Sequence, residues 1–389
     1  MSVSDIPSNS GRGVRFVVRY RISPHHGQSI EQAADDITIE QTIEAPIGCA
    51  TENIIQNGII GRVESIAPAA VLDGAYDVDI SYLCDITGYA TAQLLNVVYG
   101  NISLKSNIRV MSFDFPKELT SRFPGPSHGI DGIRAMLGVR GRPLACTPLK
   151  PMGLSARELG ELAGAFARGG VDLIKDDHGL SNQLFHPFNE RVSRCQEAVD
   201  RENARSGRRT VYCPMLSGGF DELEAQARHC VQTGARGMLI APLLVGFDTM
   251  RFLAKTFGSV VIGHPALSGT FFSQQRHGMT PAALLGTIFR LTGADISVFP
   301  NAGGRFSFTK NECADIAAAL KAPLGEVKPA FPCPAGGMSM DKIGEIATDF
   351  GVDAVLLIGG SLLMHSVDVA GSTAVFMERI REVFPGCRG

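Results

Sequence analysis

The chain has 389 residues, 44% of them hydrophobic and 19% charged, so it is long enough to form two domains with a large core. Its formal net charge of −3 gives no reason to expect a nucleic-acid partner. The apolar runs are short and interrupted, so we expect no transmembrane helix and no membrane partner. The first residues lack a signal pattern and the nine cysteines contain no CxxC, which favours reduced thiols and a cytoplasmic location.

Residues 1–125 predict a separate α+β domain. Polar and apolar residues alternate over 12–24 and again over 37–46, as expected for half-exposed strands. Residues 61–82 suggest a hairpin, and residues 90–101 look helical. The Pro- and Gly-rich stretch FPGPSHGI (123–130) then indicates a connection to a second domain.

Residues 126–389 show a different sequence pattern, in which short apolar segments alternate with segments of helical periodicity. Two helix candidates are residues 155–170, with Ser155 as N-cap, and residues 280–293, with Thr280 as N-cap. The apolar segments are residues 144–149, 171–177, 210–216, 237–244, 260–267, 294–300, 327–334 and 354–360. Such a series predicts a parallel sheet covered by helices, and eight units in about 240 residues favour a TIM barrel over an open doubly wound sheet.

The second apolar segment, VDLIKDDHGL (171–180), ends in charged side chains. Side chains alternate along a strand, so Leu173, Lys175 and Asp177 share one face, which we expect to point into the barrel mouth. Asp177 offers the hard oxygen ligands that suit Mg²⁺. An uncharged lysine amine can react with CO₂ to give a carbamate, which is also an oxygen ligand. A buried ion pair is the structural alternative.

Several stretches together resemble RuBisCO and the RuBisCO-like proteins, and they run in order over nearly the whole chain. GGVDLIKDDHGL (169–180) resembles the family's Lys-Asp-Asp-Glu metal motif. The other matching stretches are YGNISL (99–104), FPGPSHGI (123–130), GRPLACTPLKPMGLS (141–155), RHGMTPAALLGTIFRLTGADI (276–296), CPAGGM (333–338) and LLIGGS (356–361). The resemblance implies a ferredoxin-like N-terminal domain over residues 1–125 and a (β/α)8 catalytic barrel over residues 126–389.

The resemblance also implies site residues. Lys175 matches the carbamylated metal-binding lysine and Asp177 the second ligand, while His178 stands where the family has a glutamate. Imidazole suits Zn²⁺, Mn²⁺ or Fe²⁺ better than Mg²⁺. His178 is therefore a ligand for another divalent metal, an acid–base group, or a loop histidine with a local hydrogen bond.

Three departures argue against CO₂ fixation. An ungapped alignment places Leu149 where the carboxylases have a general-base lysine, and Lys150 follows one residue later as a candidate base or a surface lysine. The loop 301–308 contains Arg305 as its only cation, where a lysine is expected. On the fifth strand His264 is retained, but Pro265 replaces an arginine. The sequence therefore indicates a RuBisCO-like protein that is not a carboxylase.

Two Gly-Gly pairs follow the seventh and eighth strands and match the family's phosphate loops. Glycine permits close backbone approach, so these loops are candidates for binding phosphate, with tight turns as the alternative. The residues are Ala335, Gly336, Gly337, Gly359 and Gly360. The resemblance also implies a homodimer, or a multiple of one, in which Asn101 and Glu40 complete the neighbour's site.

Three functions remain open for the implied metal-assisted enolate chemistry on a phosphorylated sugar derivative. The main hypothesis is decarboxylation, transcarboxylation or hydrolytic cleavage of a 3-oxo sugar-acid phosphate, of the 3-oxo-isoapionate-4-phosphate type, because that reaction needs no base at the first strand. The alternative is an enolase or isomerase of methionine salvage, which needs a positioned base, with Lys150 or His264 in that role. The third is a sugar-phosphate-binding protein without catalysis.

Overall fold

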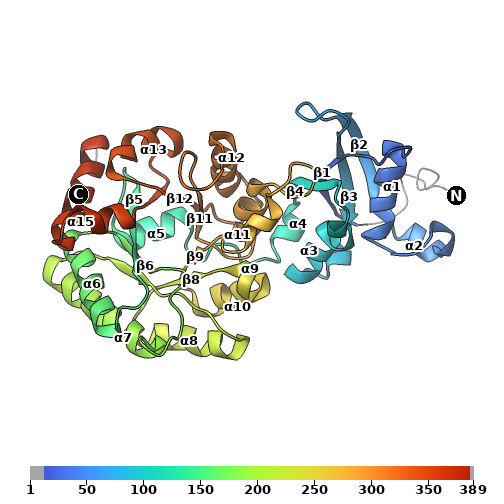
Figure 1. The fold of residues 1–389 in the computed structure, drawn as a ribbon. Helices are drawn as coiled ribbons and strands as arrows, with labels where there is room; N and C mark the ends of the chain where they lie inside the picture. Colours follow the sequence, from blue (N-terminus) through green and yellow to red (C-terminus); the bar gives the residue numbers. More distant parts are fainter. Residues whose placement is uncertain (1–12, 386–389) are drawn as a thin grey trace. The chain divides into compact units, whose positions relative to one another are not determined.

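The computed structural model describes residues 13–385, which divide into two compact units (Figure 1). The first unit runs to Phe123 and also contains Leu267–Ile288 and Pro323–Val327. The second contains Pro124–Ala266, Phe289–Ala322 and the chain from Lys328 onward. Residues 1–12, which carry our prediction of no signal peptide, and Cys387 lie outside the described residues. The other eight cysteines are free thiols.

The first unit is built on a sheet with five strands among the described residues, in the order β10-β4-β1-β3-β2. Strand β10 pairs parallel with β4, and the other neighbours pair antiparallel. On β1, every second residue is buried, and the alternate arginines Arg19 and Arg21 form ion pairs across to β3. The strand bounds are β1 Arg15–Ile22, β2 Arg62–Pro68, β3 Tyr76–Leu83, β4 Ile108–Asp114 and β10 Gly278–Met279.

The predicted hairpin over 61–82 and the predicted helix over 90–101 are confirmed by β2–β3 and by α3. The prediction of a strand over 37–46 is wrong, because helix α1, Ile30–Glu40, covers its first four residues and the other six form no strand. Ser29 and Gln32 form a capping box at the start of α1, and its buried residues recur at helical spacing. The helices of this unit are α1 Ile30–Glu40, α2 Glu52–Gln56, α3 Thr91–Tyr99 and α4 Lys117–Thr120, with a π-helix at Ala282–Ile288.

The second unit is the predicted (β/α)8 barrel. Its strands form two parallel four-stranded sheets, β13-β5-β6-β7 and β8-β9-β11-β12, in the described part of the chain. A bridge from Met215 to Leu239 joins the β7 side to β8, and β12 lies beside β13, which closes the ring. Each of the eight predicted segments contains one strand: β5 Leu144–Leu149, β6 Leu173–Asp176, β7 Val211–Cys213, β8 Gly237–Ile240, β9 Val260–Gly263, β11 Ile296–Pro300, β12 Phe331–Ala335 and β13 Val355–Leu357.

Helices alternate with the barrel strands. The predicted helix at 155–170 is confirmed by α6, which Ser155 caps through a capping box with Glu158. The predicted helix at 280–293 is confirmed in position, although most of it is the π-helix that continues into α11. The helices are α5 Gly129–Leu137, α6 Ala156–Gly169, α7 Phe188–Ser206, α8 Phe220–Gln232, α9 Pro242–Val245, α10 Phe247–Phe257, α11 Phe289–Leu291, α12 Lys310–Lys321, α13 Ile343–Phe350, α14 Gly360–His365 and α15 Val369–Val383.

Alternate residues of the barrel strands point inward and pack into one apolar cluster. Leu144 and Cys146 of β5, Leu173 of β6 and Cys213 of β7 belong to this cluster. The inward-facing positions on each strand are therefore fixed, and they determine which polar residues reach the carboxyl end of the barrel. No helix in the described chain is both long and apolar enough to cross a bilayer.

Candidate active site

Lys175 is a buried lysine on the inner face of the barrel. It lies two residues beyond inward-facing Leu173, and only 2% of its surface is exposed. Its Nζ donates a hydrogen bond to the carbonyl oxygen of Asp176 over 3.0 Å. Burial raises the pKa of the neighbouring Cys146 thiol to about 12, although Lys175 opposes that shift. The Cys146 thiol is therefore neutral at pH 7.

Asp177 and His178 begin the loop that follows β6. The Nδ1 atom of His178 lies 3.6 Å from Oδ1 of Asp177, and about half of the His178 side chain is exposed. Burial alone would raise the pKa of Asp177, but His178, Lys175 and Lys150 together lower it to about 2. Asp177 is therefore ionised at neutral pH and available as an oxygen ligand or hydrogen-bond acceptor.

His264, at the end of β9, stacks on His178. The ring centroids are 4.4 Å apart and the rings are inclined by 13°. Burial, with Lys175 and His178, lowers the pKa of His264 well below its ordinary value, so the ring is neutral at pH 7. The backbone N–H of Ala266 donates to Nδ1 over 3.2 Å, which assigns the ring proton to Nε2. The structure thus brings together two imidazoles that sequence reasoning treated separately.

Lys150 faces the lumen and Leu149 does not. Side chains alternate along β5, so Lys150 lies on the same inner face as Leu144 and Cys146. Leu149 is fully buried and pairs in register with the outward-facing Asp176. A Cβ atom placed on Gly359 would lie 3.0 Å from Lys150 Nζ, so the amine is beside the loop after β13. The ungapped alignment puts Leu149 in the base position, whereas Lys150 is the residue of this pair on the lumen-facing side of the strand.

The two Gly-Gly pairs lie in adjacent loops. Gly336 and Gly337 have φ values of 84° and 78°, which favour glycine. A Cβ on Gly336 would come within 3.2 Å of the Phe306 ring, so the loop 301–308 packs directly against it. Arg305 lies in the same loop, with its guanidinium 5.1 Å from the Phe306 ring centroid. Ser361 Oγ donates to the carbonyl oxygen of Met338 over 3.0 Å, which ties the loops after β12 and β13 together.

Glu40 and Asn101 both belong to the first unit, and they are in contact. The Nδ2 atom of Asn101 donates to Oε1 of Glu40 over 3.0 Å. Both side chains are at least partly exposed. The structure therefore presents the two predicted N-terminal site residues as one hydrogen-bonded pair.

Among the described residues, no cluster of three His, Cys, Asp and Glu side chains could hold a metal ion. The available donors are the Asp177 carboxylate and the His178 imidazole, with the Lys175 amine buried nearby. These groups fit a divalent ion if Lys175 carries a carbamate, because that group adds the missing oxygen ligand. Without the carbamate, water molecules would have to supply the remaining ligands.

Our sequence analysis assigned no role to Asp176 or to Arg191, which contacts it. Asp176 and Arg191 are both fully buried, and they form an ion pair of 3.1 Å. Arg191 sits on an otherwise ordinary amphipathic helix, α7, so helical periodicity gives no signal for it. A buried arginine on the inner face of that helix becomes visible only when β6 and α7 are placed side by side.

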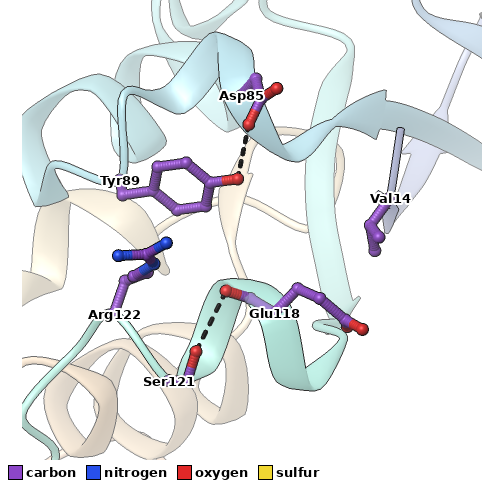
Figure 2. A pocket seen from close by; sticks show the side chains of 6 residues that line it. All are labelled: Val14, Asp85, Tyr89, Glu118, Ser121 and Arg122. Carbon is purple, nitrogen blue, oxygen red and sulfur yellow. Dashed lines mark hydrogen bonds between the residues drawn. The ribbon is translucent and has the colours of Figure 1, made fainter. Parts of the chain in front are cut away.

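A separate pocket lies entirely within the first unit (Figure 2) and has a volume of about 490 Å³. Tyr89 donates a hydrogen bond to Asp85 over 2.5 Å, and the Arg122 guanidinium lies 5.2 Å from the Tyr89 ring centroid. The lining residues are Val14, Asp85, Tyr89, Glu118, Ser121 and Arg122. None of the predicted site residues lines this pocket, so the candidate active site stays with the barrel.

Residues 129–378 match the family of the ribulose bisphosphate carboxylase large chain, catalytic domain. The chain belongs to the RuBisCO large-chain family. Over 94% of its length it is 37% identical to the 5-methylthioribulose-1-phosphate isomerase of Rhodospirillum rubrum, covering 96% of that protein. Over 75% of its length it is 32% identical to the 2,3-diketo-5-methylthiopentyl-1-phosphate enolase of Geobacillus kaustophilus, covering 72% of that protein.

The structural comparison agrees with the sequence comparison. The crystal structure of a Rubisco-like protein from Rhodopseudomonas palustris superposes with a TM-score of 0.86 and 35% identity, covering 96% of this chain and 99% of that one. The recognition of a RuBisCO-like protein from its motifs is therefore confirmed, as is the RuBisCO large-subunit architecture. The named relatives are enzymes, and their names point to methionine salvage rather than to sugar-acid decarboxylation.

Proposed function

We propose that this RuBisCO-like protein catalyses an enolase or isomerase reaction on a five-carbon 1-phosphate that carries a methylthio group at its other end. The observation that carries the proposal is the position of Lys150, whose amine reaches the barrel mouth beside Gly359 and acts electrostatically on Asp177. Enolisation requires a base near the carbon that loses its proton. Lys150 provides that base.

The position of Lys150 also removes the reason for preferring decarboxylation. That hypothesis relied on the absence of a base at the first strand, because loss of CO₂ forms an enolate without removing a C–H proton. The names of the two relatives, an isomerase and an enolase of methylthio sugar phosphates, support the alternative hypothesis in the same direction.

The site residues divide between holding groups and moving protons. Lys175 as its carbamate, Asp177 and His178 would hold a divalent ion, which supplies a Lewis acid that polarises the substrate carbonyl. Lys150 Nζ accepts the proton from the carbon next to that carbonyl. His264 donates a hydrogen bond from Nε2 to a substrate oxygen, because its Nδ1 is already occupied. The phosphate binds to Arg305 and to the backbone N–H groups of the two glycine pairs, Gly336–Gly337 and Gly359–Gly360.

We also infer an assembly of dimers. The hydrogen-bonded pair of Glu40 and Asn101 displays an amide and a carboxylate at the surface of the first unit. The family resemblance implies that this pair contributes to the neighbouring protomer's site, where an amide and a carboxylate can bind substrate hydroxyls. The protein is thus proposed to work as a homodimer or a multiple of one.

Proton exchange in D₂O tests the proposal. The enzyme is incubated with Mg²⁺, bicarbonate and either 5-methylthioribulose 1-phosphate or 2,3-diketo-5-methylthiopentyl 1-phosphate, and NMR follows solvent deuterium and product. We expect turnover of one of the two substrates and loss of both turnover and exchange in Lys150→Met. The matched control is Lys255→Met, which changes a lysine of α10 to which no role is assigned.

Three results would contradict the proposal. If Lys150→Met retained wild-type exchange, Lys150 would not be the base. If neither methylthio substrate reacted while a branched 3-oxo sugar-acid phosphate released CO₂, the decarboxylation hypothesis would replace this one. Tight binding of all these compounds without any reaction would instead indicate a sugar-phosphate-binding protein.

A further inference from the structure

We propose that Arg191 is a positioning residue for the candidate metal site, because one guanidinium holds the end of β6 and two points of the loop that carries Asp177 and His178. The inference rests on the proposed function only in the part of its test that measures enzyme activity. It concerns the geometry of the metal-binding loop, which metal binding measures directly.

The first part of the arrangement is the fully buried carboxylate of Asp176, which faces away from the lumen. Its Oδ2 accepts hydrogen bonds from Arg191 Nε at 3.1 Å and from the backbone N–H of Met215 at 3.0 Å. Its Oδ1 accepts from the Tyr212 hydroxyl at 2.7 Å. One carboxylate therefore joins β6 to α7 and to two points on or just after β7, immediately before the residue that would bind metal.

The second part is the loop from Asp177 to the start of α7. Arg191 Nη1 donates to the carbonyl oxygens of Ser181 and His186, the latter at 3.2 Å. Ser181 lies near the middle of the loop and His186 near its end, and the planar guanidinium holds both. Stacking over the Phe188 ring, at 5.3 Å from its centroid, restricts the guanidinium further.

The loop has its own internal bonds, but they do not reach β6. Gln183 Nε2 donates to the carbonyl oxygen of Gly179 at 2.9 Å, and its Oε1 lies 2.6 Å from His186 Nε2. His186 Nδ1 lies 3.1 Å from the carbonyl oxygen of Leu154, in the loop that follows Lys150. Arg191 is thus the group that connects this bonded loop to Asp176 at the strand end.

The position of Asp177 explains why the Arg191 contacts matter for metal binding. Strand β6 ends at Asp176, and Asp177 keeps only one ladder bond, from its N–H to the carbonyl oxygen of Leu149 at 3.1 Å. The Asp177 carboxylate therefore depends on the loop for its direction. Groups that orient metal ligands typically contribute 10–100-fold to metal affinity.

Arg191→Lys separates positioning from charge. A lysine keeps the buried positive charge opposite Asp176, but its single ammonium cannot reproduce the planar fork that reaches two carbonyl groups. The matched control is Arg134→Lys. Arg134 is also buried, with an ion pair to Asp353 and bonds to the carbonyl oxygens of Val139, Arg142 and Val352, but it lies before β5 and β13 rather than at the mouth.

The experiment titrates wild type and both variants with Mn²⁺ in the presence of bicarbonate, by electron paramagnetic resonance, and records the melting temperature and the steady-state kinetics of each. We expect both variants to melt at a lower temperature, because both lose buried hydrogen bonds. We expect only Arg191→Lys to bind Mn²⁺ about 10–100-fold more weakly, with kcat lowered more than KM is raised.

Mn²⁺ affinity in Arg191→Lys within twofold of wild type, at a melting temperature lowered as in Arg134→Lys, would overturn the inference and leave Arg191 a purely structural residue. An equal loss of Mn²⁺ affinity in both variants would overturn it as well. The double variant Asp176→Asn/Arg191→Met removes both buried charges, and we expect it to regain melting temperature without regaining affinity. Failure of the proposed function is distinct, since wild type would then bind Mn²⁺ but turn over neither methylthio substrate.

Discussion

At the scale of single residues, His178 is where this site departs most from the carboxylases, which carry a glutamate at that position. The imidazole is half exposed, close to Asp177 and stacked on His264. A carboxylate there would provide a second hard oxygen ligand and would remove the stack. Replacing this imidazole with a carboxylate is therefore expected to affect metal binding and turnover in opposite directions.

We expect His178→Glu to bind Mg²⁺ more tightly than wild type and to turn over more slowly. Oxygen ligands favour Mg²⁺, whereas turnover slows because the His264 ring, which donates to the substrate, loses the ring stacked on it. Mg²⁺ titration by calorimetry and kcat for the methylthio substrate measure the two effects. Full activity in the variant would show that His178 serves only as a ligand.

Gly360 allows a clean test of the phosphate site, because a Cβ on it would meet no atom within 4 Å. Gly337 is less suitable, since its φ of 78° would strain any other residue. We expect Gly360→Val to fold normally and to lose about 2–4 kcal/mol of transition-state binding, as when a few charge-assisted hydrogen bonds are displaced.

The control for Gly360→Val is Gly344→Val on α13, where a Cβ also meets open space. The comparison uses kcat/KM for the phosphorylated substrate together with the melting temperature. Unchanged kinetics in Gly360→Val, or an equal change in both variants, would argue against phosphate binding at this loop.

At the scale of elements, α6 shows how the segment that carries Lys150 is joined to a stable helix. The loop after Lys150 ends at Ser155, whose side chain accepts from the backbone N–H of Glu158 at 3.3 Å while Glu158 Oε2 accepts from the backbone N–H of Ser155 at 2.7 Å. This reciprocal pair satisfies two of the donors that a helix start leaves free.

We expect Ser155→Ala to lower the free energy of unfolding by about 1 kcal/mol, the usual loss for an N-cap serine. Ser206→Ala is the control, since Ser206 Oγ donates to the carbonyl oxygen of Glu202 near the end of α7 and accepts from the backbone N–H of Arg208 beyond it, so it serves no helix start. Urea titrations give both values. Equal losses in the two variants would mean that the capping box contributes nothing specific.

A comparison of the predicted and observed elements shows which parts of the fold can be predicted from the sequence. The barrel strands could be predicted because buried parallel strands are continuous apolar runs, and β5 has the predicted bounds. The strand at 37–46 was wrong because a local alternation of polar and apolar residues coincides with the end of a capped helix. The direction of Lys150 could not be predicted, since it depends on strand register rather than on composition. Arg191 could not be predicted because its partners are assembled only in the folded barrel.

At the scale of the whole molecule, the proposed dimer can be tested by mixing inactive variants. Lys175→Ala removes a barrel residue, and Asn101→Ala removes a residue of the first unit. If each site uses Lys175 from one protomer and Asn101 from its partner, mixed dimers contain one intact site and one doubly altered site. Random exchange at equal amounts would then restore about a quarter of wild-type activity.

We expect that recovery after the two variants are unfolded and refolded together, measured by turnover of the methylthio substrate. The control mixes Lys175→Ala with Lys150→Met, two residues of the same barrel, which gives no intact site in any mixed dimer. No recovery in the test mixture, or a fully active monomer by light scattering, would contradict the shared site.

The first unit is discontinuous in the chain, and this has a consequence for the order in which the protein forms during synthesis. Strand β10 pairs with β4, and Tyr99 Oη accepts from the backbone N–H of Gly278 at 2.8 Å, so residues near 100 wait for a segment made much later. The segment Pro323–Val327 belongs to the same unit. The nascent N-terminal sheet therefore leaves the ribosome with an unpaired edge on β4, and it becomes complete only after most of the barrel has been translated. Exposed edges of this kind attract other strands, so we expect the partly synthesised chain to aggregate more readily than the finished protein.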